Sequence, residues 1–249
     1  MEKNQEMTPT QLRKSIEKLG LSAHKYDDST LMRFLIARSM DVEKAAKMFV
    51  QEQKWREEFV PMGFIPDCQV GDELGAKKIY LQSLSRDGEH PVMIIKTNRH
   101  FSASDQLQFK RFVVHLLDKV IASSFKEGKE IGNEKIVGIL DLDKISYKNV
   151  DPRALITGFQ FLQTYYPERL AKLFIVSMPW FFVSVWKMVS HFLEKATLEK
   201  IVIVSNEEGQ INFIKYIGED TLPEEYGGRA KLVALQNVKL EHFPPTLPN

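Results

Sequence analysis

A short apolar run in the middle of the chain constrains the fold most. Residues 135–143 read KIVGILDLD, so their apolar side chains follow one another without alternation and end in carboxylates. A strand that is buried on both faces has this pattern, and such strands belong to parallel sheets that helices cover. The run therefore predicts an α/β fold built on a mainly parallel sheet.

Strand and helix patterns alternate on both sides of this run. Strands are predicted at residues 79–81, 91–96, 173–177 and 201–205. Helices are predicted at about residues 104–125, 155–163, 180–193 and 207–217. Strands that alternate with helices imply right-handed crossovers, so we expect a mainly parallel sheet flanked by helices.

The first sixty or so residues show only helical periodicity. Pro9 suits the first position of a helix, which predicts a helix over residues 9–19. Two further helical patterns follow, up to a break at Pro61. We therefore expect a helical N-terminal domain at residues 1–62 and an α/β lobe at residues 63–249.

Charge, cysteine content and hydropathy exclude several classes of protein. The 249 residues include 34 Lys and Arg against 33 Asp and Glu, and this net charge of +1 argues against a nucleic-acid partner. Cys68 is the only cysteine and nothing resembles a signal peptide, so we expect a reducing compartment, most simply the cytosol. The uncharged window at residues 173–186 contains Pro179 and is shorter than the roughly twenty residues of a bilayer span, so we expect no transmembrane helix.

The sequence lacks the motifs of common catalytic and metal sites. It has no glycine-rich phosphate loop, no G-x-S-x-G and no H-E-x-x-H, and its six histidines share no metal-ligand spacing. Asp141 and Asp143 resemble the paired aspartates of haloacid-dehalogenase phosphatases, but the residues after them depart from that motif and no second aspartate pair follows. We therefore expect no enzyme and no metal, and keep an Asp-based phosphatase as the alternative of lowest rank.

Aromatic side chains gather in one part of the chain. Ten of the 26 Phe, Tyr and Trp residues lie in the 34 residues from 159 to 192. In the predicted helix at 180–193, apolar residues cover most of the surface: Phe181, Phe182, Val185, Trp186, Met188, Val189, Phe192 and Leu193. A helix packed on a sheet needs only one apolar face. The additional bulk indicates that a second face meets a lipid tail or a bilayer, with simple packing as the alternative.

Two pairs of polar residues stand close to this aromatic segment. Glu168 and Arg169 are predicted to begin a helical turn just before an apolar strand. Thr197 and Lys200 lie three residues apart, so a hydroxyl and an ammonium group can reach one anion. The alternative is an ordinary solvated turn and a charge that flanks a strand.

Several segments together carry a resemblance to a known family. They are residues 27–38 with 54–56, and then 139–143 (ILDLD), 165–170 (YYPERL), 178–181 (MPWF), 200–203 (KIVI) and 222–228 (LPEEYGG). In this order they resemble the CRAL-TRIO lipid-transfer family, and within it the yeast phosphatidylinositol/phosphatidylcholine transfer proteins. The resemblance covers almost the whole chain. It implies a helical N-terminal domain and a lobe whose sheet floors an apolar lipid pocket.

The resemblance also implies roles for individual residues. In phosphatidylinositol-binding members, the position matched by Glu168 contacts the inositol ring, with the position matched by Arg169 beside it in the headgroup site, and those matched by Thr197 and Lys200 hold the phosphate. The aromatic helix matches the family's gate over the acyl chains, with Phe181, Phe182, Val185, Trp186, Val189 and Phe192 as its contact residues. The implied function is non-catalytic: extraction of phosphatidylinositol and its delivery to another membrane or presentation to a lipid kinase, in exchange for a second lipid.

One departure from the family concerns that second lipid. Members that bind phosphatidylcholine carry Ser or Thr at the strand positions matched by Ile136 and Gly138, and neither of these residues can bond a choline phosphate. We therefore expect a second ligand other than phosphatidylcholine, such as a sterol or isoprenoid, in a pocket near Ile136 and Gly138. An apolar carrier of this kind is the alternative function. We expect a cytoplasmic monomer with transient peripheral membrane contact, no nucleic-acid partner, and no cofactor besides the bound phospholipid.

Overall fold

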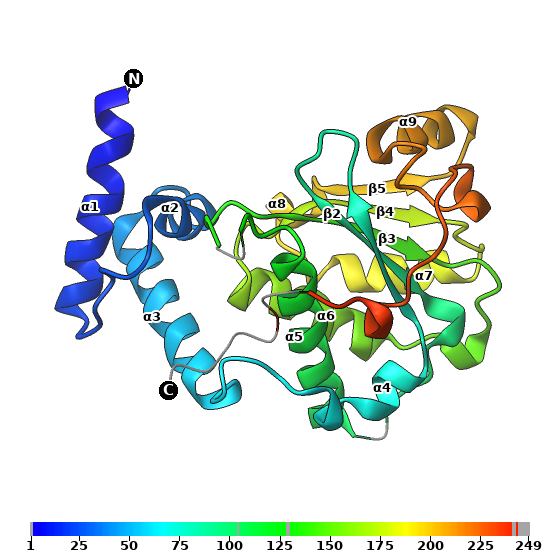
Figure 1. Ribbon diagram of the computed structural model, residues 1–249, viewed down its shortest axis with the longest axis horizontal. Coiled ribbons are helices and arrows are strands. Elements are labelled where there is room, and N and C mark those ends of the chain that lie inside the picture. The colour runs from blue at the N-terminus through cyan, green and yellow to red at the C-terminus, as the bar shows by residue number, and fades with distance from the viewer. Residues whose placement is uncertain (1, 104, 128–129, 241–242, 244–249) are drawn as a thin grey trace.

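The computed structural model describes residues 2–103, 105–127, 130–240 and 243. The first three helices lie at one end of the long axis, and the sheet with its flanking helices lies at the other (Figure 1). The predicted α/β architecture with a helical N-terminal region is confirmed. The boundary between residues 1–62 and 63–249 stays a prediction.

The sheet has five strands in the order of the chain. They are β1 (Ile79–Leu84), β2 (Pro91–Lys96), β3 (Ile136–Asp141), β4 (Leu170–Val176) and β5 (Ile201–Val204). β1 pairs antiparallel with β2, and the other pairs are parallel. All six residues of β3 are buried, so the central strand is covered on both faces as its sequence predicts.

Helices cover both faces of the sheet (Figure 1). Val137 and Ile139 of β3 pack with Phe213 of α9 (Glu207–Ile217) on one face. The helices on the other face are α5 (Gln106–Ala122), α6 (Pro152–Tyr165) and α7 (Phe182–Ser190). Alternate residues of β3, Ile136 and Leu140, belong to the apolar clusters on that face.

The N-terminal helices have an apolar core of their own. They are α1 (Glu2–Lys18), α2 (Asp28–Ala37) and α3 (Val42–Phe59), and their buried side chains include Leu12, Ile16, Leu31, Phe34, Leu35 and Phe49. The predicted start of the first helix at residue 9 is wrong, because α1 begins at Glu2 and contains Pro9. Pro9 removes one backbone hydrogen bond, and the burial of its ring offsets part of that cost.

Side chains of α3 attach the helical region to the lobe. The Trp55 ring stacks on Tyr165 with centroids 3.7 Å apart. Arg56 donates to the Tyr166 hydroxyl at 3.0 Å and pairs with Asp118 at 2.8 Å. Tyr166 donates to Asp118 at 2.8 Å, and burial together with this carboxylate raises the pKa of Tyr166. These contacts fix the end of α6 where the chain turns into β4.

Several predicted boundaries differ from the structure. No helical turn begins at Pro167: α6 ends at Tyr165, the chain turns, and β4 begins at Leu170 rather than at residue 173. Lys172 interrupts the apolar run, which hides the start of this strand in the sequence. α7 is shorter than the predicted helix at 180–193.

Short elements complete the description. They are α4 (Gly71–Gly75), α8 (Lys195–Leu198) and the 3-10 turns η1 (Asp67–Gln69), η2 (Thr97–Arg99), η3 (Tyr147–Asn149), η4 (Glu224–Tyr226) and η5 (Leu235–Asn237). α8 joins α7 to β5, and the first residues of η2 directly follow β2.

Candidate functional site

Charged side chains lie one or two residues before three neighbouring strands. Lys135 precedes β3, Glu168 lies two residues before β4, and Lys200 precedes β5. Because these strands are parallel, the three residues meet at the amino-terminal edge of the sheet. Lys200 Nζ donates to Glu168 Oε2 at 2.9 Å, and Lys135 Nζ lies 4.0 Å from the same oxygen. The Glu168 side chain is 15% exposed and that of Lys200 is 25% exposed, so solvent reaches this group.

The backbone holds Glu168 in an uncommon conformation. Its φ is +56°, in the left-handed region that costs an L-residue about 1–2 kcal/mol. Both ends of the turn are anchored, by Tyr166 on one side and by Arg169 on the other. The anchored ends hold this strained turn in place, and with it the Glu168 carboxylate at the edge of the sheet.

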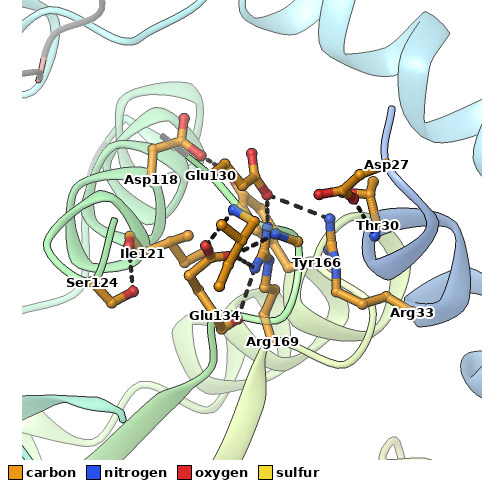
Figure 2. A network of polar contacts seen from close by, with 12 residues as sticks. Asp27, Thr30, Arg33, Asp118, Ile121, Ser124, Glu130, Glu134, Tyr166 and Arg169 are labelled. Atoms are coloured by element: carbon orange, nitrogen blue, oxygen red, sulfur yellow. Dashed lines mark hydrogen bonds and ion pairs between the residues drawn. The ribbon is translucent and has the colours of Figure 1, made fainter. Parts of the chain in front are cut away.

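Arg169 lies behind this turn in a buried network (Figure 2). Its Nη1 donates to the backbone and the carboxylate of Glu134, both at 2.8 Å, and its Nη2 pairs with Glu130. Burial and the neighbouring Arg33 lower the pKa of the Arg169 guanidinium, yet it stays charged between two carboxylates. Its side chain is 4% exposed. A direct contact of Arg169 with a headgroup stays a prediction, whereas its hold on the loop before β3 is observed.

A hollow of about 370 Å³ separates the amino-terminal edge from the first two helices. The residues that line it are Pro9, Asp28, Ser29, Met32, Arg33, Ile36, Asn133, Lys135 and Glu168. Arg33 Nη2 lies 3.5 Å from Glu130, and its buried Nε has no partner among the described residues (Figure 2). The sequence analysis missed Arg33 and Lys135. The position of Lys135 before the strand next to β4 is the signal that could have identified it.

Gly132 brings the loop before β3 close to α2. Its φ is +87°, and a Cβ at this position would lie 2.5 Å from both the backbone nitrogen and the hydroxyl of Thr30. Glu134 accepts hydrogen bonds from the backbone of Ile131 and Gly132, which shapes the loop from within. A larger residue at 132 would push the loop away from α2 and change the hollow.

Thr197 lies on α8, one turn before Lys200. Its side chain is half-buried, and its carbonyl accepts a hydrogen bond from the Lys200 backbone at 3.0 Å. The structure thus brings Glu168 and Lys200 into direct contact and places Thr197 on the segment that leads to Lys200. The assignment of these residues to a lipid headgroup stays a prediction.

A second cavity, of about 160 Å³, lies inside the lobe between the sheet, α5, α6 and Phe182. Gly138 lines it, and a Cβ there would approach Leu173 Cδ1 to 2.7 Å. Ile136 is 1% exposed within the core against α5 and does not line the cavity. A volume near 150 Å³ holds about one benzene molecule, so a two-chain lipid requires the lobe to open.

α7 buries one apolar side and carries both apolar and polar side chains on its exposed side. Phe182 and Val189 are buried beneath it, while Val183 is 51% and Met188 is 44% exposed on its outer side. The flanking Trp180 and Phe192 are 81% and 53% exposed. Val185, Trp186 and Phe181 are half-buried in the cluster under the helix. Of the six predicted gate residues, only Phe182 lines the inner cavity.

The two aspartates that raised the question of catalysis have different environments. Asp141 is buried, and its Oδ2 accepts a hydrogen bond from the Tyr226 hydroxyl at 2.6 Å. Lys96 Nζ lies 3.7 Å from the same oxygen. The side chain of Asp143 is 55% exposed, and its backbone nitrogen donates to Asp141 Oδ1. Asp141 therefore has structural partners, and nothing in the described part of the chain favours the phosphatase alternative.

No helix within the described ranges combines the length and the apolar character that crossing a membrane requires. One group of candidate metal ligands is present among those residues, Asp87, Glu89 and His90 at the β1–β2 turn. Both carboxylates there are exposed, and no second observation points to an ion.

Comparisons with known proteins bear on the family and the fold. Residues 77–228 match the family model of the CRAL/TRIO domain, and residues 5–51 match that of the CRAL/TRIO N-terminal domain. The Sec14 cytosolic factor of Schizosaccharomyces pombe is 28% identical over 243 residues, which cover 91% of this chain and 83% of that protein. The CRAL-TRIO domain-containing protein YKL091C of Saccharomyces cerevisiae is 31% identical over 229 residues, or 84% of this chain and 73% of that protein.

Two further matches extend the comparison. The phosphatidylinositol/phosphatidylcholine transfer protein SFH12 of Arabidopsis thaliana is 29% identical over 228 residues, which cover 84% of this chain and 41% of that protein. The crystal structure of Sfh5 superposes with a TM-score of 0.65 at 18% identity, over 88% of this chain and 77% of that one. This last likeness is one of fold.

Proposed function

Because the chain belongs to the CRAL-TRIO lipid-transfer family, we propose that it binds phosphatidylinositol and moves it between membranes in exchange for a second lipid. The observation that carries this proposal is the solvent-accessible pair of Lys200 and Glu168 at the amino-terminal edge of the sheet. The pair stands where an ammonium group can bind a phosphate while a carboxylate accepts hydroxyl groups.

Headgroup binding requires the pair to exchange partners. The phosphate replaces Glu168 on Lys200 and receives a further hydrogen bond from the Thr197 hydroxyl, while Glu168 accepts hydrogen bonds from the inositol ring. Solvent reaches both side chains, so each can be solvated while it changes partner. Lys135, 4.0 Å from Glu168 and 36% exposed, adds a second positive charge to the same edge.

Uptake of the acyl chains requires α7 to move. Burial of each methylene contributes about 0.8 kcal/mol, but the inner cavity of about 160 Å³ is too small for two chains. Phe182 lines the cavity from α7, so an outward movement of this helix enlarges it. The exposed Trp180 and Phe192 at the two ends of the helix then meet the bilayer surface, where aromatic side chains bind readily.

Other parts of the proposal follow from the same reasoning. β3 offers no hydroxyl to a choline phosphate at Ile136 or Gly138, so we propose that the second lipid is not phosphatidylcholine. We also propose that the protein acts in the cytoplasm without catalysis, that its membrane contact is transient, and that a lipid kinase is a candidate recipient of the bound phosphatidylinositol.

A transfer assay between vesicles tests the headgroup site. Lys200→Met and Glu168→Gln should each reduce phosphatidylinositol transfer at least about tenfold, because each removes a charged hydrogen-bond partner of the headgroup. The matched controls are Lys195→Met and Glu199→Gln, which break an exposed pair 3.8 Å apart on the neighbouring segment and should leave transfer unchanged.

Circular dichroism should show all four variants folded. Unchanged transfer by both Lys200→Met and Glu168→Gln would refute the headgroup site. In the same assay, wild-type protein should transfer phosphatidylcholine weakly, and transfer as fast as that of phosphatidylinositol would refute our interpretation of β3.

A further inference from the structure

A chain of buried polar side chains reaches the wall of the inner cavity. Lys78 pairs with Glu73 of α4, and Lys78 Nζ lies 2.8 Å from His100 Nδ1. His100 Nε2 lies 3.4 Å from Asp151 Oδ2. Glu73, Lys78 and Asp151 are each less than 10% exposed, and Lys78, His100 and Asp151 line the cavity.

The geometry determines which atoms carry protons. The Lys78 ammonium can only donate, so Nδ1 of His100 accepts and Nε2 carries the ring proton toward Asp151. Burial and the adjacent Lys78 lower the pKa of His100, which keeps the imidazole neutral. The four side chains therefore hold two negative charges and one positive charge at neutral pH.

Stability alone does not explain this network. A buried ion pair that is replaced by apolar side chains of similar volume usually leaves a protein as stable or more stable. Here the pair borders a cavity whose other walls are mostly apolar. A few charged groups in the wall of an otherwise apolar cavity are characteristic of a ligand-binding site.

The network leaves one donor for a ligand. Two of the three Lys78 N–H groups are used by Glu73 and His100 among the described residues. Lys78 is 4% exposed, so water has little access to its ammonium group, which also lies 5.6 Å from the ring centre of Phe109 and 5.3 Å from that of Phe112. The nearby Thr97 and Asn149 already donate to backbone carbonyls.

We propose that the cavity takes a second ligand that is apolar except for one neutral hydrogen-bond acceptor, a hydroxyl or carbonyl oxygen, which Lys78 Nζ binds at the cavity wall. Glu73 and His100 position the ammonium group, and Asp151 positions His100. The net negative charge of the network disfavours a carboxylate or phosphate in the same place. This inference rests on the proposed carrier function, in which the cavity opens to lipids.

Four small probes on the intact chain test the chemistry of this subsite. Ethylbenzene, acetophenone, 1-phenylethanol and benzoate share a ring of the size that the cavity holds. In calorimetric titrations, acetophenone and 1-phenylethanol should bind at least as tightly as ethylbenzene, although water solvates their oxygen atoms better. Benzoate should bind more weakly than all three.

A charge-neutral double variant then removes the donor. Glu73→Gln with Lys78→Met removes one charge of each sign, so the net charge of the network stays the same, and it should weaken acetophenone and 1-phenylethanol at least about tenfold relative to ethylbenzene. Lys77→Met, at the exposed neighbouring position, should leave all four affinities unchanged. The wild-type series decides the question even if the double variant fails to fold.

Three results would overturn the proposal. In the first, the wild type binds benzoate most tightly of the four probes. In the second, the wild type binds both acetophenone and 1-phenylethanol tenfold more weakly than ethylbenzene. In the third, the folded double variant keeps the wild-type affinities of these two probes relative to ethylbenzene. None of these measurements involves phosphatidylinositol. A negative result in the probe titrations therefore leaves the headgroup site untouched, because Lys200→Met tests that site separately by transfer.

Discussion

The amino-terminal and the carboxyl-terminal edge of the sheet both carry charged side chains, but solvent reaches these side chains to different extents. At the amino-terminal edge, Lys200 and Glu168 form a pair that solvent reaches, with 25% and 15% of their side chains exposed. At the carboxyl-terminal edge, Lys96, Asp141 and Tyr226 are joined in a network in which the Asp141 side chain is 4% exposed. The accessible pair can exchange partners with a ligand, whereas the buried network fixes the segment around Tyr226 to the sheet.

The largest expected effect concerns the support behind the accessible pair. Arg169→Met leaves the buried Glu134 carboxylate without its cation, so it should lower the free energy of unfolding by about 3–5 kcal/mol. Arg229→Met, which removes an arginine that is 64% exposed and paired with Glu219 and Asp220, should cost less than about 1 kcal/mol. Urea denaturation of both variants provides the measurement. Equal, small losses of stability in both variants would mean that the buried Arg169 holds the amino-terminal edge no more firmly than an exposed arginine does. The accessible Lys200–Glu168 pair would then not differ from the residues behind it.

An intermediate effect is expected at the carboxyl-terminal edge. Tyr226→Phe removes the hydroxyl that donates to Asp141 at 2.6 Å, and a hydrogen bond to a charged group contributes about 1.5–3 kcal/mol. Tyr147→Phe removes a hydroxyl from a residue that is 71% exposed and should change the free energy of unfolding by less than about 0.5 kcal/mol. Urea denaturation separates the two. If Tyr226→Phe were as mild as its control, Asp141 would not depend on this contact and the carboxyl-terminal edge would be open as well.

The comparison also shows what the sequence can predict. The buried strand β3 and the helix α9 follow from continuous or periodic apolar residues, and the structure confirms both. The pairing of Glu168 with Lys200 is a consequence of topology, because only the parallel order of β4 and β5 brings their preceding residues together.

Contacts between distant residues account for what the sequence analysis missed. Arg169 pairs with Glu134, 35 positions away, across a loop whose shape depends on Gly132. Lys78 meets His100 because β1 is antiparallel to β2, which brings the residue before one strand beside the segment that follows the other. Neither pairing leaves a periodic signal in the sequence, since periodicity reports the buried face of an element and not its charged ends.

The smallest expected effect is a pH dependence of stability at the carboxyl-terminal edge. Burial and Lys78 lower the pKa of His100, while Asp151 and Glu73, which also face this network, oppose the shift. The unfolded chain takes up a proton on this histidine below about pH 6.5, where the folded protein still holds it neutral. The free energy of unfolding should therefore fall as the pH drops below about 6.5, by at most about 1.4 kcal/mol per pH unit for one group.

His100→Gln isolates this contribution from those of the other histidines. The amide oxygen of glutamine can accept from Lys78 and its nitrogen can donate to Asp151, so the contacts can persist without a titrating group. Urea denaturation of wild type and variant between about pH 5 and 8 should show a shallower loss of stability in the variant at low pH, and both curves should run parallel above about pH 7. Identical slopes below pH 6.5 would mean that His100 is as free to bind a proton in the folded protein as in the unfolded chain. The carboxyl-terminal edge would then be open to water at this point, and the contrast with the amino-terminal edge would be confined to Asp141 and Tyr226.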